Sequence, residues 1–486
     1  MPANLVPSAS EFLRISPEIL LTLVGTLMMT LESMFSRKRT LGVIAFIALL
    51  AAIGLSVAAH GDPGEAFHGM IRVDGFTTFF RILVFATGML TILMSANYLE
   101  KAHAESAEFY ALLVFCIVGQ SLMVSSNELI MIFIGLETSS IASYVLAGYL
   151  RADRRNSEAA LKYFLLGSFA TAFLLYGVAW TYGITGTTNL SAIRQFLLGG
   201  QGSESALLLL AAAALMFVGF AFKVSAAPFQ MWAPDVYQGA PAPVSAFLSA
   251  GPKAAAFAMF FRVALTAFEP IKGNWEPLLW ASALATMVIG NFAALRQTNI
   301  KRLLAYSSIA HAGYVMVALT TASETGTAAA MFYLAAYAAM NLGAFAVVTH
   351  VARRGERYVE VNDMAGLSIR QPATAALLTI FLLSLIGVPL TGGFFGKFYI
   401  FKAALDANLV WLTVLGLLNS AVAAYYYLRI VVVMYMQPPA EGDTVLESPS
   451  AGIAVTIWAT AVATVLLGVL PGFVLDFAGR SAGFAR

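Results

Sequence analysis

The feature that most constrains this fold is a series of apolar segments, each about 20 residues long, separated by short polar connections. A helix of that length crosses the hydrocarbon core of a membrane, whereas a membrane β-barrel has alternating strands of about ten residues. Of the 486 residues, 59% are hydrophobic and 11% are charged, against about a quarter charged in soluble domains. The sequence therefore predicts an all-α polytopic membrane protein.

We expect about 14 transmembrane helices from the number of such segments. Their approximate centres are Thr26, Leu50, Phe85, Ile117, Thr138, Leu174, Leu215, Phe257, Ala285, Ile309, Ala338, Ile386, Leu418 and Thr464. Four clusters of Lys and Arg fall on the same side if the helices alternate in direction: Arg37, Lys38 and Arg39; Arg151, Arg154 and Arg155; Arg296, Lys301 and Arg302; Arg353, Arg354 and Arg357. Positively charged short loops face the cytoplasm, so both termini are expected on the periplasmic side.

The stretch 217–262 places two lysines, Lys223 and Lys253, in apolar surroundings. Between them lie Pro228, Pro234, Pro241 and Pro243. Proline removes a backbone donor and its ring clashes with the preceding turn, so the seventh helix must break or kink here. Within a membrane, a break survives only where protein or a water-filled cavity satisfies the freed backbone groups. A lysine beside such a break is therefore a candidate functional residue.

Glu137 lies well inside the fifth predicted helix, in the run IMIFIGLETSSIASYVLAGYL. An ionisable side chain at this depth costs about 2.5–3.5 kcal/mol on insertion scales and usually faces a partner inside the bundle. Lys223 is the expected partner, because a movable carboxylate can switch a buried amine between its charged and neutral forms. Two readings stay open: a proton relay, and a purely structural ion pair between two helices.

Three further ionisable residues extend the predicted relay. Lys253 lies on the eighth helix, and Lys397 lies on the twelfth, where Pro389 and several glycines loosen the helix. Lysine suits a relay because a desolvated amine can release its proton, whereas arginine effectively cannot. A free imidazole titrates near neutrality, so His311 is expected to pass a proton from Lys253 to Lys397. A histidine held by a hydroxyl in a packed interface is the alternative.

Lys162 lies about one turn from the start of the sixth helix. Its long side chain can follow the helix to the membrane boundary, so it is either a member of the pathway or a surface group. Arg81, Arg262 and Arg429 are assigned to structure or helix ends, because arginine keeps its proton.

Several kinds of chemistry find no support in the sequence. Cys116 is the single cysteine, and one thiol cannot hold an iron–sulfur cluster or form an internal disulfide. The run GGFFGK at 392–397 fails as a phosphate loop, because Thr391 replaces its first glycine and Phe398 its magnesium-binding hydroxyl. No haem-binding histidine pair or dinucleotide fingerprint is present, and a net charge of +2 is too small to suggest nucleic-acid binding. We expect no cofactor and no metal in this chain.

A weak internal repeat appears in the ionisable positions. The same number of positions separates Glu137 from Lys223 and His311 from Lys397. Each interval ends on the second helix after its start, and proline interrupts that later helix in both cases. Interrupted segments at matching positions in two halves point to a transporter-like pathway. A unit of five helices would make successive copies opposite in membrane orientation.

Three motifs make this chain resemble a known family. They are FKVSAAPFQMWAPDVYQGAPAPVSAFLSAGPKAA at 222–255, QTNIKRLLAYSSIAHAGY at 297–314 and GVPLTGGFFGKFY at 387–399. Together they resemble the antiporter-like membrane subunits of respiratory complex I, and most of all the N-type subunits of bacterial NADH-quinone oxidoreductase. The resemblance covers nearly the whole chain. Lysine at position 397 favours the N type over the M type, which has glutamate there, and no lateral arm of the L type is expected.

The resemblance implies two inverted five-helix repeats, helices 4–8 and 9–13, with helices 7 and 12 broken. The expected divisions are an N-terminal three-helix segment at 1–107, the first repeat at 108–270, the second at 271–436 and a C-terminal helix at 437–486. It also implies roles for individual residues. Glu137 matches the family's glutamate on the fifth helix, Lys223 its partner on the seventh, Lys253 the central lysine of the eighth, Lys397 the twelfth-helix position and Lys162 a lysine of the sixth.

The implied function is proton translocation in a bacterial inner-membrane NADH-quinone oxidoreductase, along Glu137, Lys223, Lys253, His311 and Lys397. NADH, FMN, iron–sulfur clusters and quinone are then expected in partner subunits, and other complex I membrane subunits are expected as neighbours in the bilayer. Two alternatives stay open: a subunit of a multisubunit sodium/proton antiporter, and a structural spacer of the membrane arm. The proteins that copurify with this chain would distinguish complex I from an antiporter. The effect of substituting the relay residues would distinguish a proton path from a spacer.

Overall fold

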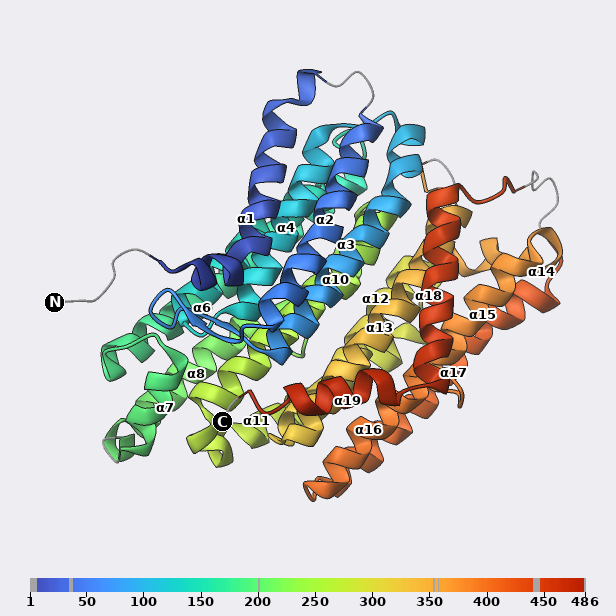
Figure 1. Cartoon of the computed structure of the whole chain (residues 1–486). Coiled ribbons are helices and arrows are strands. Elements are labelled where there is room, and N and C mark those ends of the chain that lie inside the picture. Colours follow the sequence, from blue (N-terminus) through green and yellow to red (C-terminus); the bar gives the residue numbers. More distant parts are fainter. Residues whose placement is uncertain are drawn as a thin grey trace.

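The computed structural model describes residues 7–34, 38–199, 202–352, 355–356, 358–439 and 446–484. Within these ranges, 13 helices are long and apolar enough to cross a membrane, and they stand together as one bundle (Figure 1). They are α1 Ala9–Thr30, α2 Arg39–His60, α3 Gly75–Ala102, α4 Ala107–Ser125, α5 Leu129–Ala147, α6 Arg154–Thr185, α8 Gly202–Val224, α10 Ala242–Arg262, α11 Lys272–Ala294, α12 Ile300–Thr320, α13 Glu324–Val351, α17 Val410–Met436 and α18 Ala451–Val469.

Both predicted helix breaks are present. The seventh predicted helix divides into α8 and α9 (Trp232–Gly239), and the twelfth into α15 (Pro372–Ile386) and α16 (Gly392–Asp406). All the predicted centres lie in helices, with Ile386 as the last residue of α15. The count of about 14 crossings and the inverted relation of the segments 108–270 and 271–436 stay predictions.

The remaining elements are short. They are α7 Leu190–Leu198, α14 Leu367–Arg370, α19 Gly472–Ser481 and an antiparallel hairpin of β1 Gly64–Ala66 and β2 Ile71–Val73. In Figure 1, α19 lies crosswise to α18 at the foot of the bundle.

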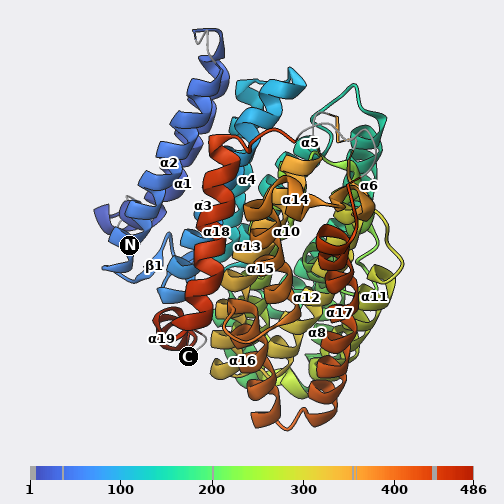
Figure 2. The ribbon, with the colours of Figure 1, turned by 90° about the vertical axis from the view of Figure 1, so that its right-hand side faces the viewer.

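Burial separates the central helices from the peripheral ones. The most apolar windows of α10 and α12 are each 94% buried and that of α13 is 89% buried, whereas that of α1 is 28% buried. A helix that is apolar on all sides lies in a core or faces lipid, and these three occupy the middle of the bundle (Figure 2). Lys253 on α10 and His311 on α12 therefore lie at the centre of the molecule.

Glycines bring the helices that carry the candidate residues close to their neighbours. A Cβ at Gly119 of α4 would lie 2.4 Å from the backbone nitrogen of Ser139 on α5, and one at Gly290 of α11 would lie 2.5 Å from that of Ala310 on α12. Small residues at membrane helix interfaces allow such close backbone approach. The packing fixes α5, which carries Glu137, and α12.

Positively charged connections that the sequence places on one side do meet at one end of the bundle. Arg155 Nη2 donates to the carbonyl of Gly355 (3.1 Å), and Lys301 forms an ion pair with Glu356 (2.5 Å). These contacts join the start of α6, the start of α12 and the connection after α13. Four of the predicted basic residues, Arg37, Arg353, Arg354 and Arg357, lie outside the described residues.

The three arginines assigned to structure make structural contacts. Arg81 forms a buried ion pair with Glu18 (2.7 Å), Arg262 pairs with Asp74 (3.0 Å), and Arg429 donates to two carbonyls of the α11–α12 connection. Asp74 lies in the loop before α3. Burial raises the pKa of Asp74, but the charge and hydrogen bonds of Arg262 outweigh burial and hold it below its ordinary value.

Candidate functional site

Neutral side chains satisfy the backbone groups that the break between α8 and α9 frees. The indole Nε1 of Trp232 donates to the carbonyl of Phe222 (2.8 Å). From α11, Ser282 Oγ donates to the carbonyl of Ala227 (2.6 Å), and Thr286 Oγ1 accepts from its backbone nitrogen (2.8 Å). A break at membrane depth requires such partners. Because neutral groups supply them, the lysine in the last turn of α8 has no part in holding the break.

Lys223 is that lysine, and aromatic rings surround its ammonium. Nζ lies 5.6 Å from the ring centre of Tyr144 on α5 and 5.7 Å from that of Tyr163 on α6. Ring faces attract a cation without fixing the direction of its N–H groups. Among the described residues, no hydrogen bond and no ion pair within 4.0 Å reaches this amine, so no directional contact fixes its position.

Glu137 does not form the direct ion pair with Lys223 that the sequence predicts. In the part of the chain that the structure describes, no ion pair within 4.0 Å joins the two, and Glu137 Oε1 is buried without a hydrogen-bond partner. The ammonium lies over the rings of Tyr144 and Tyr163 instead. The structure therefore shows this acid–base pair in an open arrangement.

Lys253 bridges the three central helices. It follows Pro252 inside α10 and is 3% exposed. Its Nζ donates to the carbonyl of Ser308 on α12 (2.8 Å) and to the hydroxyl of the same residue. It also lies 6.0 Å from the ring centre of Tyr337 on α13.

His311 is held between two phenol hydroxyls. Its Nδ1 lies 2.5 Å from Tyr333 Oη, and its Nε2 lies 3.1 Å from Tyr427 Oη. The rings of Tyr314 and Tyr337 also pack against the imidazole. Because a phenol can donate or accept, both tautomers of the imidazole find partners. The arrangement satisfies a packed histidine and equally allows a proton to change nitrogens.

Lys397 itself satisfies the break between α15 and α16. From α16, its Nζ donates to the carbonyls of Leu385 (3.0 Å) and Ile386 (2.9 Å), the last residues of α15, and to Ser420 Oγ on α17 (2.8 Å). The last carbonyls of a helix lack helical partners and carry partial negative charge, which favours a cation. The ammonium also lies 4.8 Å from the ring centre of Tyr314.

One face of α12 connects the two buried lysines. Ser308, His311 and Tyr314 are spaced by three residues, so they follow one side of the helix over a rise of about 9 Å. Lys253 binds Ser308 at one end of this stripe, and Lys397 lies over Tyr314 at the other. The structure thus brings Lys253, His311 and Lys397 into one buried line.

Lys162 lies apart from this line. Its Nζ forms ion pairs with Glu158 (2.8 Å) and Asp235 (2.7 Å), and its side chain is 42% exposed. Asp235, on α9, also accepts from Arg302 of α12 (2.7 Å). Of the two interpretations of Lys162 that the sequence left open, this geometry supports a surface group.

The sequence analysis missed the hydroxyl-bearing residues around these amines. Around the lysines and the imidazole these are Tyr144, Tyr163, Tyr314, Tyr333, Tyr337, Ser420 and Tyr427. A signal was present, since a phenol buried in an apolar helix usually has a hydrogen-bond partner. Which tyrosines face the lysines depends on how α5, α6, α13 and α17 are rotated against their neighbours, and spacing along one helix does not reveal that rotation.

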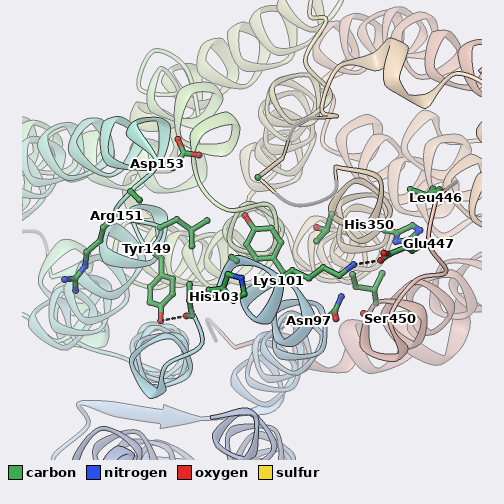
Figure 3. Close-up of a pocket in the computed structure, with 18 of the residues that line it drawn as sticks. Asn97, Lys101, His103, Tyr149, Arg151, Asp153, His350, Leu446, Glu447 and Ser450 are labelled. Atoms are coloured by element: carbon green, nitrogen blue, oxygen red, sulfur yellow. Dashed lines mark hydrogen bonds and ion pairs between the residues drawn. The ribbon is translucent and has the colours of Figure 1, made fainter. Parts of the chain in front are cut away.

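A cavity of about 1320 Å³ opens where the positively charged loops meet (Figure 3). It is lined by the ends of α3 and α13, the α5–α6 loop and the connection before α18, and includes Lys101, His103 and His350. Asp153 also lines it. The hydrogen bond from Arg155 holds the pKa of Asp153 below its ordinary value. The cavity gives water access to one end of the central helices.

The described residues contain no group of three or more His, Cys, Asp or Glu side chains placed to hold a metal ion. The thiol of Cys116 is buried and forms hydrogen bonds with Ser139. What the central helices offer is a set of buried amines, an imidazole and hydroxyls. These groups can hold and pass protons.

The candidate residues all fall in a region that matches a known protein family. Residues 126–423 match the family described as NADH:quinone oxidoreductase/Mrp antiporter, TM. Among curated relatives, NADH-quinone oxidoreductase subunit N 1 of Solibacter usitatus is 61% identical over 484 residues, with 99% of each chain covered. NADH-quinone oxidoreductase subunit N 2 of Koribacter versatilis is 48% identical, with 97% of each chain covered.

Solved structures show the same likeness. A chain of respiratory complex I from Thermus thermophilus with bound aureothin is 35% identical, with a TM-score of 0.82 over 95% of this chain and 99% of that one. A chain of the Mrp complex from a Dietzia species has a TM-score of 0.86 over 98% of this chain and 97% of that one, at 19% identity. At that identity the second likeness concerns the fold alone.

Proposed function

The chain belongs to the NADH:quinone oxidoreductase/Mrp antiporter family as a subunit N of NADH-quinone oxidoreductase, and from this premise we propose how it moves protons. It is a proton-translocating, multi-pass membrane subunit that assembles with other membrane subunits of complex I. The sodium/proton antiporter alternative finds support only in fold likeness.

We infer that this subunit is the translocase part of a bacterial inner-membrane enzyme whose NADH, FMN, iron–sulfur clusters and quinone are bound by partner subunits. Positively charged loops gather at the end of the bundle that carries the cavity. Such loops face the cytoplasm in inner-membrane proteins. In this proposal the cavity opens toward the cytoplasm, and both termini lie on the periplasmic side.

The proposed path runs from Lys223 to Lys253 and then along α12 to Lys397. The observation that carries it is the buried line of Lys253, His311 and Lys397 along one face of α12. Each ionisable group at membrane depth costs about 2.5–3.5 kcal/mol, so such groups are kept for function. In each step an N–H bond of the donor breaks as one forms on the next acceptor.

Coupling to electron transfer requires an element with two states, and we assign it to Glu137 and Lys223. When the carboxylate approaches the amine, the ammonium form is favoured. When the two separate, as in this structure, burial favours the neutral amine and the proton leaves toward Lys253. Contacts with ring faces alone leave Lys223 able to respond. Lys162 stands outside the proposed path: its Nζ pairs with Asp235 of α9 at an exposed position, and Arg302 holds the same carboxylate.

Replacing Lys253 with methionine tests the relay. In membrane vesicles that contain the assembled complex, NADH-driven proton pumping and NADH:quinone turnover should fall by about tenfold or more, since positioned proton-transfer groups contribute at least that much. Lys402→Met, at an exposed position of α16, is the matched control. A structural spacer would instead lose assembled complex while the remaining complex pumped normally, and that result would overturn the relay.

A further inference from the structure

A proton path needs an opening to water, and the carboxylate of Glu356 lies where one is needed. Glu356 is 7% exposed and accepts from Tyr98 Oη (2.8 Å), the backbone nitrogen of Ala242 (2.6 Å) and Lys301 Nζ (2.5 Å). Tyr98 and Gly355 both line the cavity of Figure 3. The carboxylate therefore lies directly behind the cavity lining, separated from the cavity by the Tyr98 hydroxyl that it accepts from.

Two helices lead from this carboxylate to the centre of the relay. Ala242 begins α10, and Lys253 follows about three turns and about 16 Å further along the same face. Lys301 lies in the first turn of α12, and Ser308, which accepts from Lys253, lies about two turns further along its own face. Because α10 and α12 contact each other, Glu356 and Lys253 mark the two ends of one interface.

Polar side chains follow this interface. Ser245, Ser249 and Lys253 are four residues apart on one face of α10, and Asn341 Nδ2 of α13 donates to Ser249 Oγ (2.6 Å). Among the described residues, three buried oxygens nearby have no hydrogen-bond partner: Tyr237 Oη, Tyr337 Oη and Asn341 Oδ1. Buried polar atoms are normally bonded, often to water. This series of oxygens therefore suits a hydrated route.

We propose that Glu356 is the carboxylate through which protons pass from the cavity to Lys253. The proposal rests on the relay described above. In the uptake step, an O–H bond forms on Glu356 as a hydronium ion in the cavity becomes water, and Lys301 stays an ammonium. In the transfer step, that O–H bond breaks and an N–H bond forms on the neutral amine of Lys253. Glu356 is then a carboxylate again and re-forms its ion pair with Lys301.

A purely structural role for Glu356 predicts a different result. As a latch, it would only tie the connection after α13 to α3, α10 and α12. Glutamine keeps the shape of the side chain and an oxygen that accepts from Tyr98 and Ala242, but it cannot take up and release a proton. Loss of the carboxylate alone also leaves the ammonium of Lys301 buried without its partner, which is destabilising. The double variant Glu356→Gln with Lys301→Gln removes both charges and avoids this problem.

The test compares these variants in membrane vesicles, with NADH-driven pumping and NADH:quinone turnover normalised to the assembled complex on a native gel. Glu356→Gln and the double variant should each lower pumping by about tenfold. Glu447→Gln is the matched control, because Glu447 lines the same cavity and its side chain is 79% exposed in its pair with Lys101. Its pumping should match the wild type.

Normal pumping by assembled Glu356→Gln or by the double variant would overturn the uptake role. Lys253→Met, measured in parallel, separates the two proposals: loss of pumping there, beside normal Glu356 variants, rejects the uptake site and leaves the relay in place. If neither Glu356 variant assembles, Tyr98→Phe decides, because it removes only the hydroxyl between cavity and carboxylate. Slower pumping by Tyr98→Phe supports the route, and unchanged pumping rejects it.

Discussion

The two broken helices meet the same physical need in opposite ways. At the break between α8 and α9, neutral side chains of α9 and α11 form hydrogen bonds with the freed backbone groups. Lys223 forms none of these bonds and lies near the rings of Tyr144 and Tyr163. At the break between α15 and α16, Lys397 donates to the last carbonyls of α15. One lysine is therefore independent of the backbone, and the other is part of its support.

Because of this difference, loss of a proton has different structural consequences at the two lysines. An ammonium has three donors, and those of Lys397 have three acceptors: Leu385 O, Ile386 O and Ser420 Oγ. Loss of its proton removes one donor, so protonation of Lys397 is coupled to the geometry of the break. Lys223 can lose a proton without freeing any backbone group. The first break therefore suits a switch that is independent of the backbone, whereas at the second a change of charge is tied to the geometry of the break.

Lys397→Ala should have the largest effect, because it removes a relay member and a structural donor together. We expect pumping to be lost. We also expect a lower thermal midpoint of the detergent-solubilised complex, since each buried acceptor left without a donor costs about 1–3 kcal/mol. Lys402→Ala on the exposed face of the same helix is the control for both measurements. An unchanged thermal midpoint of the Lys397→Ala complex would show that Lys397 does not stabilise its break, and the two breaks would no longer differ in this respect.

Lys223→Ala should have a large effect on pumping and a small one on stability. Pumping and quinone-linked NADH oxidation should fall sharply while the complex still assembles. No hydrogen bond or ion pair within 4.0 Å is lost among the described residues. The losses are the contacts with the Tyr144 and Tyr163 rings, worth about 0.5–2 kcal/mol, and the longer-range attraction of Glu137. Comparing the thermal midpoints of the Ala variants at 223 and 397 in one preparation sharpens the contrast. Near-normal pumping by the assembled Lys223→Ala complex would count against the relay.

Trp232→Phe should have the converse effect, a loss of stability with pumping largely kept. The ring remains, and the carbonyl of Phe222 loses the indole donor but keeps the backbone N–H of Ser225 (3.1 Å). The expected cost is therefore that of one hydrogen bond, about 0.5–1.5 kcal/mol. Trp458→Phe, at an exposed position of α18, is the matched control and should leave the thermal midpoint unchanged. If Trp232→Phe instead abolished pumping at full stability, the first break would not be independent of the relay.

Local rules were enough to predict the helices and both breaks from the sequence. The length of an apolar segment sets a crossing, and proline acts on the turn that contains it. The same rules indicated the depth of Glu137 and Lys253 but not how each helix is rotated about its axis. Spacing along one helix therefore could not show whether Glu137 and Lys223 approach within ion-pair distance. In this structure no ion pair within 4.0 Å joins them, and their partnership in the relay stays a prediction. The order Lys253, His311 and Lys397 was predicted, but the contacts of Ser308 and Tyr314 with the two lysines became visible only once α10, α12 and α16 were packed together.

The smallest effect should come from Lys162, which tests whether the exposed cluster beside the first break belongs to the path. Lys162→Ala removes ion pairs with Glu158 and Asp235, and exposed pairs of this kind contribute about 0–1 kcal/mol. Asp235 keeps its hydrogen bond from Arg302, so α9 stays in place and pumping should remain close to that of the wild type. The measurement is proton pumping beside Lys223→Ala in the same vesicles. A loss as large as that of Lys223→Ala would make Lys162 a member of the path. The first break would then carry two lysines that transfer protons, one on α6 and one on α8, whereas the second break carries Lys397 alone.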